Sequence, residues 1–183
     1  MKTMENIITE RLIIRRFLKT DWQDLYEYLS DPEVVYFEPY EVYTQEQAME
    51  EAIRRIDHTS FFAVCLKDSQ KLIGNLYFNR GDFDTWELGY VFNRTFQKQG
   101  YAMESATALI NHAFSCLGAR RIIARCSTKN VSSWRLLERL RLRREGMFLQ
   151  NVYFKTKPNG EPDWFDSYSY AILKEEWIKN NSY

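Results

Sequence analysis

The stretch QKQGYA, from Gln97 to Ala102, joins small residues, a lysine and side-chain amides just before a strongly helical segment. The first turn of a helix carries unpaired backbone N–H groups and about half a positive charge, which together bind anions. Gly100 and Ala102 would let the backbone approach a bulky pyrophosphate, and Lys98 would add a neutralising charge. A tight turn that only leads into the helix explains the glycine as well, so both interpretations stay open on this stretch alone.

The chain has few of the residues that other common catalytic and binding sites require. The turn lacks the Gly-Lys-Ser/Thr of a Walker phosphate loop and the glycines of a dinucleotide fingerprint. His58 and His112 are the only histidines, which argues against histidine-based catalysis and a histidine-rich metal site. The chain has three cysteines, Cys65, Cys116 and Cys126, and they show no metal-ligand or redox spacing. We therefore expect their thiols to be reduced, and we expect no bound metal.

The composition is that of an ordinary globular protein. Its 183 residues carry 25 basic and 25 acidic side chains, and this length fits one domain, 1–183, with a real core. The balanced charge gives no reason to expect nucleic acid as a direct partner. No run reaches the roughly 20 apolar residues that span a bilayer, and no signal-peptide pattern is visible. We therefore expect a cytoplasmic protein without a membrane partner.

Hydrophobic periodicity and caps predict the elements that surround the turn. Helices are predicted to begin at two capping boxes, Thr20 with Gln23 and Thr44 with Gln47, and at the favourable N-cap Asn130. The helix after QKQGYA is predicted to stop at Gly118. Strands are predicted over 11–18, 60–68, 71–79, 86–93, 120–127, 145–155 and 164–173. This order indicates a mixed α/β domain rather than a regular alternation.

Five segments in sequence carry a resemblance to a known family. They are ERLIIRRF near the start, ELGYVF at Glu87, QKQGYA, NVSSWRLLERL from Asn130 and DSYSYAILKEEW near the end. QKQGYA matches the Gln/Arg-x-x-Gly-x-Gly/Ala coenzyme signature of the GNAT N-acetyltransferase superfamily. The set as a whole resembles its RimJ/RimL branch of ribosomal-protein N-terminal acetyltransferases. The resemblance implies an acetyl-CoA-dependent acyltransferase with the GNAT fold, a mixed, mostly antiparallel sheet of about six to seven strands flanked by about four helices.

The resemblance also implies roles for particular residues. Glu87 would be the general base, and Ser133 would protonate the leaving thiolate. An ordinary carboxylate at position 87 and a first-turn capping serine explain these residues as well, and Tyr168 or Tyr170 could replace Ser133 as the donor. The implied coenzyme-binding residues are Phe92, Gln97, Lys98, Gly100, Tyr101, Ala102 and Asn130.

An aromatic segment offers the only indication of the acceptor. Tyr36, Phe37 and Tyr40, with Glu38 and Glu41, would line the mouth of the acceptor site, because acidic and aromatic groups suit a cationic amine. Packing of helices onto the sheet would explain the same aromatics. The acceptor could be a ribosomal-protein N-terminus, a polyamine, an aminoglycoside or another small amine. A protein that binds acetyl-CoA without turnover, as a sensor or partner module, is the alternative, and a homodimer stays open.

The chain departs from the family pattern at two turns. Arg141-Leu142 stands where Gly-Phe is usual after the Asn130 helix, and Lys98-Gln99 stands where Gly-Lys is commoner. A residue other than glycine at a helix end must avoid a positive φ or absorb strain. The basic run RLRLRRE, 139–145, could meet the coenzyme's 3′-phosphate or RNA, although a surface strand edge explains it as well.

Overall fold

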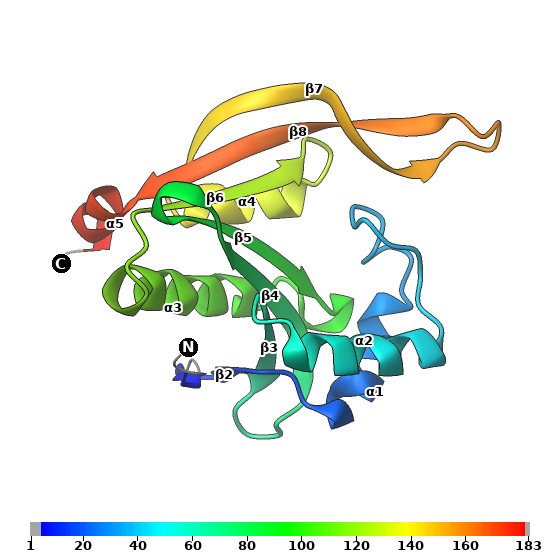
Figure 1. The fold of residues 1–183 in the computed structure, drawn as a ribbon, viewed down its shortest axis with the longest axis horizontal. Coiled ribbons are helices and arrows are strands. Elements are labelled where there is room, and N and C mark those ends of the chain that lie inside the picture. The colour runs from blue at the N-terminus through cyan, green and yellow to red at the C-terminus, as the bar shows by residue number, and fades with distance from the viewer. Residues whose placement is uncertain (1–4, 182–183) are drawn as a thin grey trace.

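The computed structural model describes residues 5–181, so the two ends of the predicted 1–183 domain lie outside the described part. Its strands form one sheet in the order β1-β2-β3-β4-β5-β6-β8-β7, shown in Figure 1. All neighbouring strands are antiparallel except β5 and β6, which run parallel. The strands are β1 (Ile7–Ile8), β2 (Leu12–Arg15), β3 (Phe61–Leu66), β4 (Leu72–Arg80), β5 (Thr85–Phe92), β6 (Arg121–Ser127), β7 (Arg143–Thr156) and β8 (Pro162–Leu173).

The α-helices lie in layers on the two faces of this sheet (Figure 1). Side chains of a strand point alternately to opposite faces. On β3, accordingly, Phe62 and Val64 pack with α3 and α4, whereas Ala63 and Cys65 pack with α1 and α2. The helices are α1 (Trp22–Leu29), α2 (Gln45–Asp57), α3 (Tyr101–Cys116), α4 (Val131–Arg139) and α5 (Lys174–Asn181).

The predicted mixed α/β fold is confirmed, with eight strands and five α-helices in the described residues instead of about six to seven and four. The additional strand, β1, has two residues, too few for a periodic pattern to be recognised. The additional helix, α5, follows β8 directly, without the glycine or proline that would mark a boundary in the sequence.

Most of the local start and stop signals are confirmed. Thr44 and Gln47 exchange the two hydrogen bonds of a capping box, and Gly118 takes φ +71° after the end of α3. The capping box predicted at Thr20 is wrong. Asp21 accepts the Leu18 N–H at 2.7 Å and holds both terminal nitrogens of Arg15 at 2.8 Å. A carboxylate with a cationic partner is the stronger acceptor, so the chain enters α1 through Asp21.

The sheet opens between its two parallel strands. β5 pairs with β6 only from Thr85 opposite Arg121 to Glu87 opposite Ile123, and its remaining residues, 88–92, have no partner on β6. Figure 1 shows the two strands diverging beyond this point. The open edge therefore presents backbone groups of β5 that a ligand can bind.

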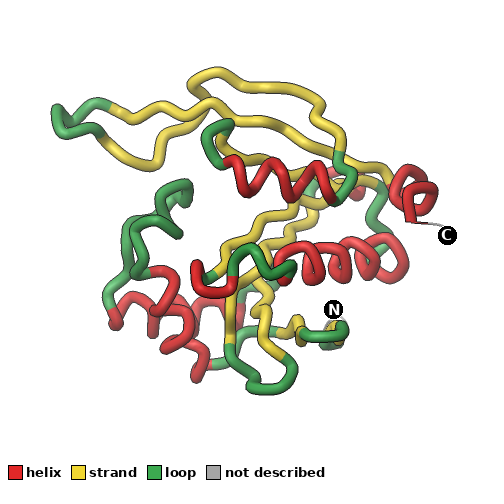
Figure 2. Tube along the Cα trace, turned by 180° about the vertical axis from the view of Figure 1, so that it is seen from behind, coloured by secondary structure: helices red, strands yellow, loops and turns green. Residues whose placement is uncertain are grey.

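The long β7–β8 hairpin and the segment between α1 and α2, residues 30–44, face each other across this opening. Figure 2 shows the hairpin arching past that segment. The Lys155 ammonium donates to the Tyr40 carbonyl at 2.8 Å, and the rings of Tyr36 and Phe165 lie 5.8 Å apart. These contacts join two parts of the chain that are more than a hundred residues apart.

The exit of α4 absorbs strain at the position where the family usually has glycine. Arg141 takes φ +63°, and the N–H of Leu142 bonds to the Leu137 carbonyl at 3.0 Å. Leu142 itself is buried in the core. The end of the helix therefore has the backbone geometry that glycine usually provides, and Arg141 adopts a strained left-handed conformation to form it.

Candidate functional site

A cavity of about 800 Å³ occupies the opening in the sheet. One end is formed by the turn before α3 and the first turn of α3, and the other by residues 34–40, β7 and β8. Its floor is made of the β4 and β5 strands, among them Asn75, Tyr77 and Gly89. Eight of the residues that the sequence offers for binding the coenzyme or protonating its thiolate line this space: Phe92, Gln97, Lys98, Gly100, Tyr101, Ala102, Asn130 and Ser133.

The N-terminus of α3 has the geometry of an anion site. Gly100 is its N-cap at φ +87°, a left-handed conformation that favours glycine. The first N–H groups of a helix have no acceptors within it, and Gly100 has no side chain to offer them one. A Cβ at Gly100 would lie 3.2 Å from Nη2 of Arg11. The turn can therefore bring bare backbone amides close to a phosphate group.

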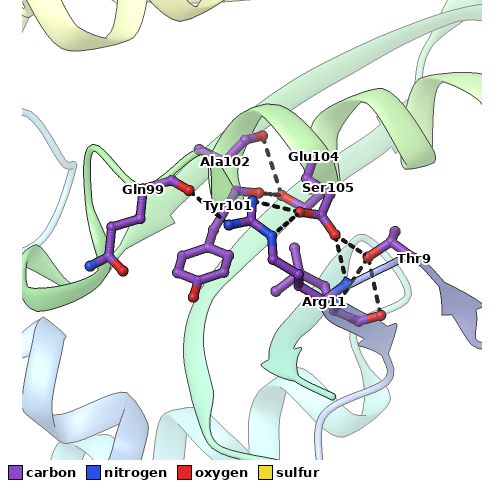
Figure 3. Close-up of polar contacts among 8 residues, drawn as sticks. Thr9, Arg11, Gln99, Tyr101, Ala102, Glu104 and Ser105 are labelled. Carbon is purple, nitrogen blue, oxygen red and sulfur yellow. Dashed lines mark hydrogen bonds and ion pairs between the residues drawn. The ribbon is translucent and has the colours of Figure 1, made fainter. Parts of the chain in front are cut away.

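Arg11, which directly precedes β2, holds this turn through contacts with residues about ninety positions away in the sequence (Figure 3). Its Nε donates to Oε2 of Glu104 at 2.7 Å, and its Nη1 donates to the Gln99 carbonyl at 3.0 Å. Its guanidinium also lies 4.4 Å from the centre of the Tyr101 ring. Burial acts to raise the pKa of Glu104, but hydrogen bonds from Thr9 and Arg11 outweigh it and hold that pKa below its usual value. The brace therefore keeps its negative charge at neutral pH.

Gln97 and Phe92 connect the turn to the open strand. The side-chain amide of Gln97 donates to the Phe92 carbonyl at 2.9 Å, which fixes the turn to the end of β5. Lys98 takes φ +60° and is one of the residues that line the cavity. A lysine thus adopts the left-handed conformation that glycine would adopt more easily, and it brings a positive charge to the cavity.

The start of α4 places hydroxyl groups on the opposite wall. Asn130 caps the helix, because its Oδ1 accepts the Ser133 N–H at 3.1 Å, as predicted. The Tyr90 hydroxyl lies 2.9 Å from Oγ of Ser133 and donates to the Ser133 carbonyl at 3.1 Å. Burial raises the pKa of Tyr90, so this hydroxyl keeps its proton and can donate. Burial also raises the pKa of the nearby Cys126 thiol to about 11, which makes a nucleophilic thiolate unfavourable.

The sequence does not single out Tyr90, and the alternative donors that it offers beside Ser133 are Tyr168 and Tyr170. Neither of those two is among the described residues that line the cavity. The Tyr170 hydroxyl donates to Glu138 and accepts from Arg144, both at 3.0 Å, on the outer side of α4. The alternation of Leu88, Tyr90 and Phe92 toward α3 and α4 is the signal that could have identified Tyr90.

Glu87 lies outside the cavity. It stands on β5 opposite Asn79 and Ile123, where the sheet is still closed, and it is not among the described residues that line the opening. Its assignment as general base stays a prediction that the geometry does not support.

The other end of the cavity is aromatic and carries a carboxylate. Phe37 and Tyr40 line it as expected, whereas Tyr36 is 42% exposed and is not among the lining residues. Glu38 lines it between them, and burial raises the pKa of its carboxyl to about 7. The position of Glu38 near the acceptor is predictable from the aromatic segment, but its raised pKa depends on burial that the sequence does not show.

A buried polar network supports this end from below. Arg55 of α2 is 1% exposed, donates to Glu51 at 2.6 Å and to Oδ1 of Asn75 at 3.0 Å, and lies over the Phe61 ring. The Tyr28 hydroxyl donates to the same Asn75 oxygen at 2.8 Å. Because each of these groups has a partner, the network holds Asn75 rigidly in the cavity floor.

Two of the four arginines in the basic run 139–145 are paired with acidic side chains. Arg143 bonds to Glu145 and Glu176, and Arg144 bonds to Glu138. Arg139 lines the cavity instead. In the described residues, no group of three or more His, Cys, Asp or Glu side chains could hold a metal ion. No helix of residues 5–181 is long and apolar enough to cross a membrane.

Comparison with known proteins agrees with this architecture. A family model described as an acetyltransferase (GNAT) domain matches residues 11–143. The Bacillus subtilis (strain 168) protein named uncharacterized N-acetyltransferase YnaD is 40% identical over 175 residues, covering 94% of this chain and 99% of its own. A GNAT-family acetyltransferase from Bacillus anthracis superposes with a TM-score of 0.85 at 36% identity, covering 94% of this chain and 100% of its own.

A third similarity concerns the fold alone. The spermidine N-acetyltransferase of Vibrio cholerae, solved in complex with CoA and spermine, superposes with a TM-score of 0.75 at 16% identity, over 93% of this chain and 99% of its own. By contrast, the family model matches residues 11–143, and the Bacillus subtilis relative is 40% identical over 94% of this chain. This protein therefore belongs to the GNAT family of acetyltransferases.

Proposed function

We propose that this acetyltransferase moves the acetyl group of acetyl-CoA to a primary amine by direct transfer in a ternary complex. One observation carries the proposal: a single cavity connects the anion site of α3 with an aromatic, carboxylate-bearing end, along the open edge of β5. A donor and an acceptor bound from opposite ends would meet at that edge.

The residues at the donor end fit the coenzyme. The pyrophosphate would bind the amides at the N-terminus of α3, with Lys98 as a countercharge, and Gly100 has no side chain to compete for those amides. The pantetheine arm would follow the unpaired backbone of β5 toward Asn130. Such pairing resembles the addition of a strand to an open sheet edge.

The chemistry requires a neutral amine, because an ammonium group has no lone pair. At pH 7, deprotonation costs roughly 4–5 kcal/mol for a lysine-like amine with a pKa of about 10.4, and about 1 kcal/mol for an α-amino group with a pKa near 8. Attack on the thioester gives an oxyanion that backbone N–H groups at the open edge would stabilise. The leaving thiolate would be protonated at the hydroxyl pair of Ser133 and Tyr90.

The acceptor is proposed as a class only. Phe37, Tyr40 and Glu38 suit a cationic amine with an apolar body. A polyamine, as named for the Vibrio cholerae enzyme, and a protein N-terminus, as in the RimJ/RimL branch, both satisfy this description. The fold does not decide between them.

Calorimetric titration with acetyl-CoA, followed by a thiol-release screen, tests the proposal. The screen would use spermidine, tyramine, an aminoglycoside and a peptide with N-terminal alanine. Saturable binding with thiol release for one acceptor class is expected. Binding without release across the panel would indicate a sensor, and the absence of binding would overturn the donor assignment.

A further inference from the structure

The acceptor end of the cavity contains one carboxylate. Among the described residues that line the cavity, Glu38 is the only aspartate or glutamate. It follows Phe37 and precedes Pro39 and Tyr40, which line the same space. An amine that enters past these residues therefore meets the Glu38 carboxylate and no other acidic side chain.

Glu38 lies beside the open edge of the sheet. Its carboxylate is close enough to Arg55 for the guanidinium to influence its titration, and Arg55 bonds to Asn75 at 3.0 Å. Asn75 lies opposite Val91 of β5, four residues beyond the last β5–β6 pair at Glu87. Glu38 lines the same cavity as the part of β5 that has separated from β6.

The groups around Glu38 leave it able to take a proton. Burial raises its pKa, whereas Arg55 of α2, the Tyr40 hydroxyl of its own segment and Lys155 of β7 lower it. The cations are engaged elsewhere: Arg55 binds Glu51, and Lys155 binds the Tyr40 carbonyl and Glu41. Neither forms an ion pair with Glu38 in the described structure, so the carboxylate is partly stabilised but not neutralised.

We propose that the Glu38 carboxylate takes the proton of the acceptor's ammonium group inside the cavity, an inference that rests on the acetyl transfer proposed above. The resulting nitrogen lone pair bonds to the thioester carbonyl carbon, and the carbon–sulfur bond breaks with its electrons on sulfur. The second proton of the nitrogen goes to that sulfur, by way of the Ser133 and Tyr90 hydroxyls. Glu38 then returns its proton to solvent, so an ammonium ion and acetyl-CoA give an amide, CoA and one proton.

This role differs from the one that the sequence suggested for Glu87. Glu87 lies where β5 and β6 are still paired, whereas Glu38 lines the cavity itself. The two assignments make opposite predictions for two isosteric variants, Glu38→Gln and Glu87→Gln.

The test measures kcat/KM against pH for the wild type and for both variants, with spermidine, tyramine and the alanine peptide as acceptors. Glu38→Gln is expected to lower kcat/KM by roughly 100-fold or more. It should also abolish the wild-type rise in kcat/KM around pH 7 and leave only the rise set by the amine. Calorimetry should give an unchanged Kd for acetyl-CoA. Glu33→Gln is the matched control, because the Glu33 side chain is 70% exposed and lies in the same segment.

Tyr40→Phe provides a second, independent readout. Its hydroxyl lowers the pKa of Glu38, so its loss should move the rise in kcat/KM to higher pH rather than remove it. A purely structural role for Glu38 would not shift the profile in this way.

The outcomes separate the two proposals. If the wild type releases no thiol, the proposed acetyl transfer fails. If the wild type is active and Glu38→Gln keeps its rate and its pH profile, Glu38 is not the proton acceptor. Loss of acetyl-CoA binding in Glu38→Gln would equally overturn the inference, since the residue would then act through the structure.

Discussion

Replacing Glu38 by glutamine should make the protein more stable at alkaline pH while removing its activity. Burial raises the pKa of Glu38 from 4.5 to about 7 in the folded protein, so between these values the folded chain binds more protons than the unfolded chain. The free energy of unfolding therefore falls as pH rises through this window. Glutamine has no charge to bury, and the variant escapes this loss.

The size of the effect follows from the shift. One pKa unit corresponds to about 1.4 kcal/mol, so the full displacement costs the wild type about 3 kcal/mol above pH 7. Glu38 is only partly shielded from solvent, which lowers the expected gain of the variant to about 1–3 kcal/mol at pH 8.5. Below pH 4.5 the carboxyl is protonated in both states, and the gain should vanish.

Urea unfolding at pH 5, 7 and 8.5 measures this difference. Glu33→Gln is the control: it keeps Glu38, so its stability should follow the pH dependence of the wild type. A stability change of the same size at all three pH values would refute the reasoning. A variant less stable than the wild type at pH 8.5 would refute it as well, because the carboxylate would then be favourably bound in the fold.

Four further substitutions test the donor end and the two strained turns. Arg11→Ala should raise the Kd for acetyl-CoA about fivefold, because a partly exposed ion pair contributes only about 1 kcal/mol. Calorimetry should show a smaller effect on acetyl-pantetheine, which lacks the pyrophosphate. Gly100→Val should strongly weaken acetyl-CoA binding, since a β-branched residue is strained at φ +87° and its Cβ would press on Arg11, which braces the turn. An unchanged Kd would contradict a role for this turn in binding. Arg141→Gly should stabilise the fold by about 1 kcal/mol in urea unfolding and leave acetyl-CoA binding unchanged. Lys98→Gly should relieve similar strain but weaken acetyl-CoA binding, and equal binding by both glycine variants would remove Lys98 from the site.

Local rules predicted the parts of the fold that depend on neighbouring residues. The capping box of Thr44, the cap of Asn130 and the stop at Gly118 each involve residues within a few positions of one another. The capping box predicted at Thr20 was wrong because the neighbouring Asp21 bonds to Arg15 on the preceding strand. A cap chosen from propensity alone does not include such a competing ion pair.

The site depended more on contacts between distant residues. Arg11 and Glu104 are separated by 93 positions, and only the packing of β2 against α3 brings them together. The turn QKQGYA could be identified from its small residues, but the arginine that braces it could not. The opening of the sheet could not be predicted from neighbouring residues either. The loss of pairing after Glu87 depends on where β6, a strand distant in the sequence, diverges from β5.

Among the described charged and titratable groups of the acceptor end, Glu38 is the one whose charge changes near neutral pH. Burial acts to lower the pKa of Arg55, but the raising effects of Tyr28 and Glu51 are larger together. The guanidinium therefore stays charged near neutral pH. Burial raises the pKa of Tyr40 and of Tyr90, so both phenols stay protonated. Neither histidine is among the described residues that line the cavity. Glu38, whose pKa lies at about 7, is thus the acidic group there that changes charge under these conditions. A carboxylate that changes charge near neutral pH, in a cavity beside the open strand, is the arrangement that proton abstraction from a bound ammonium group requires.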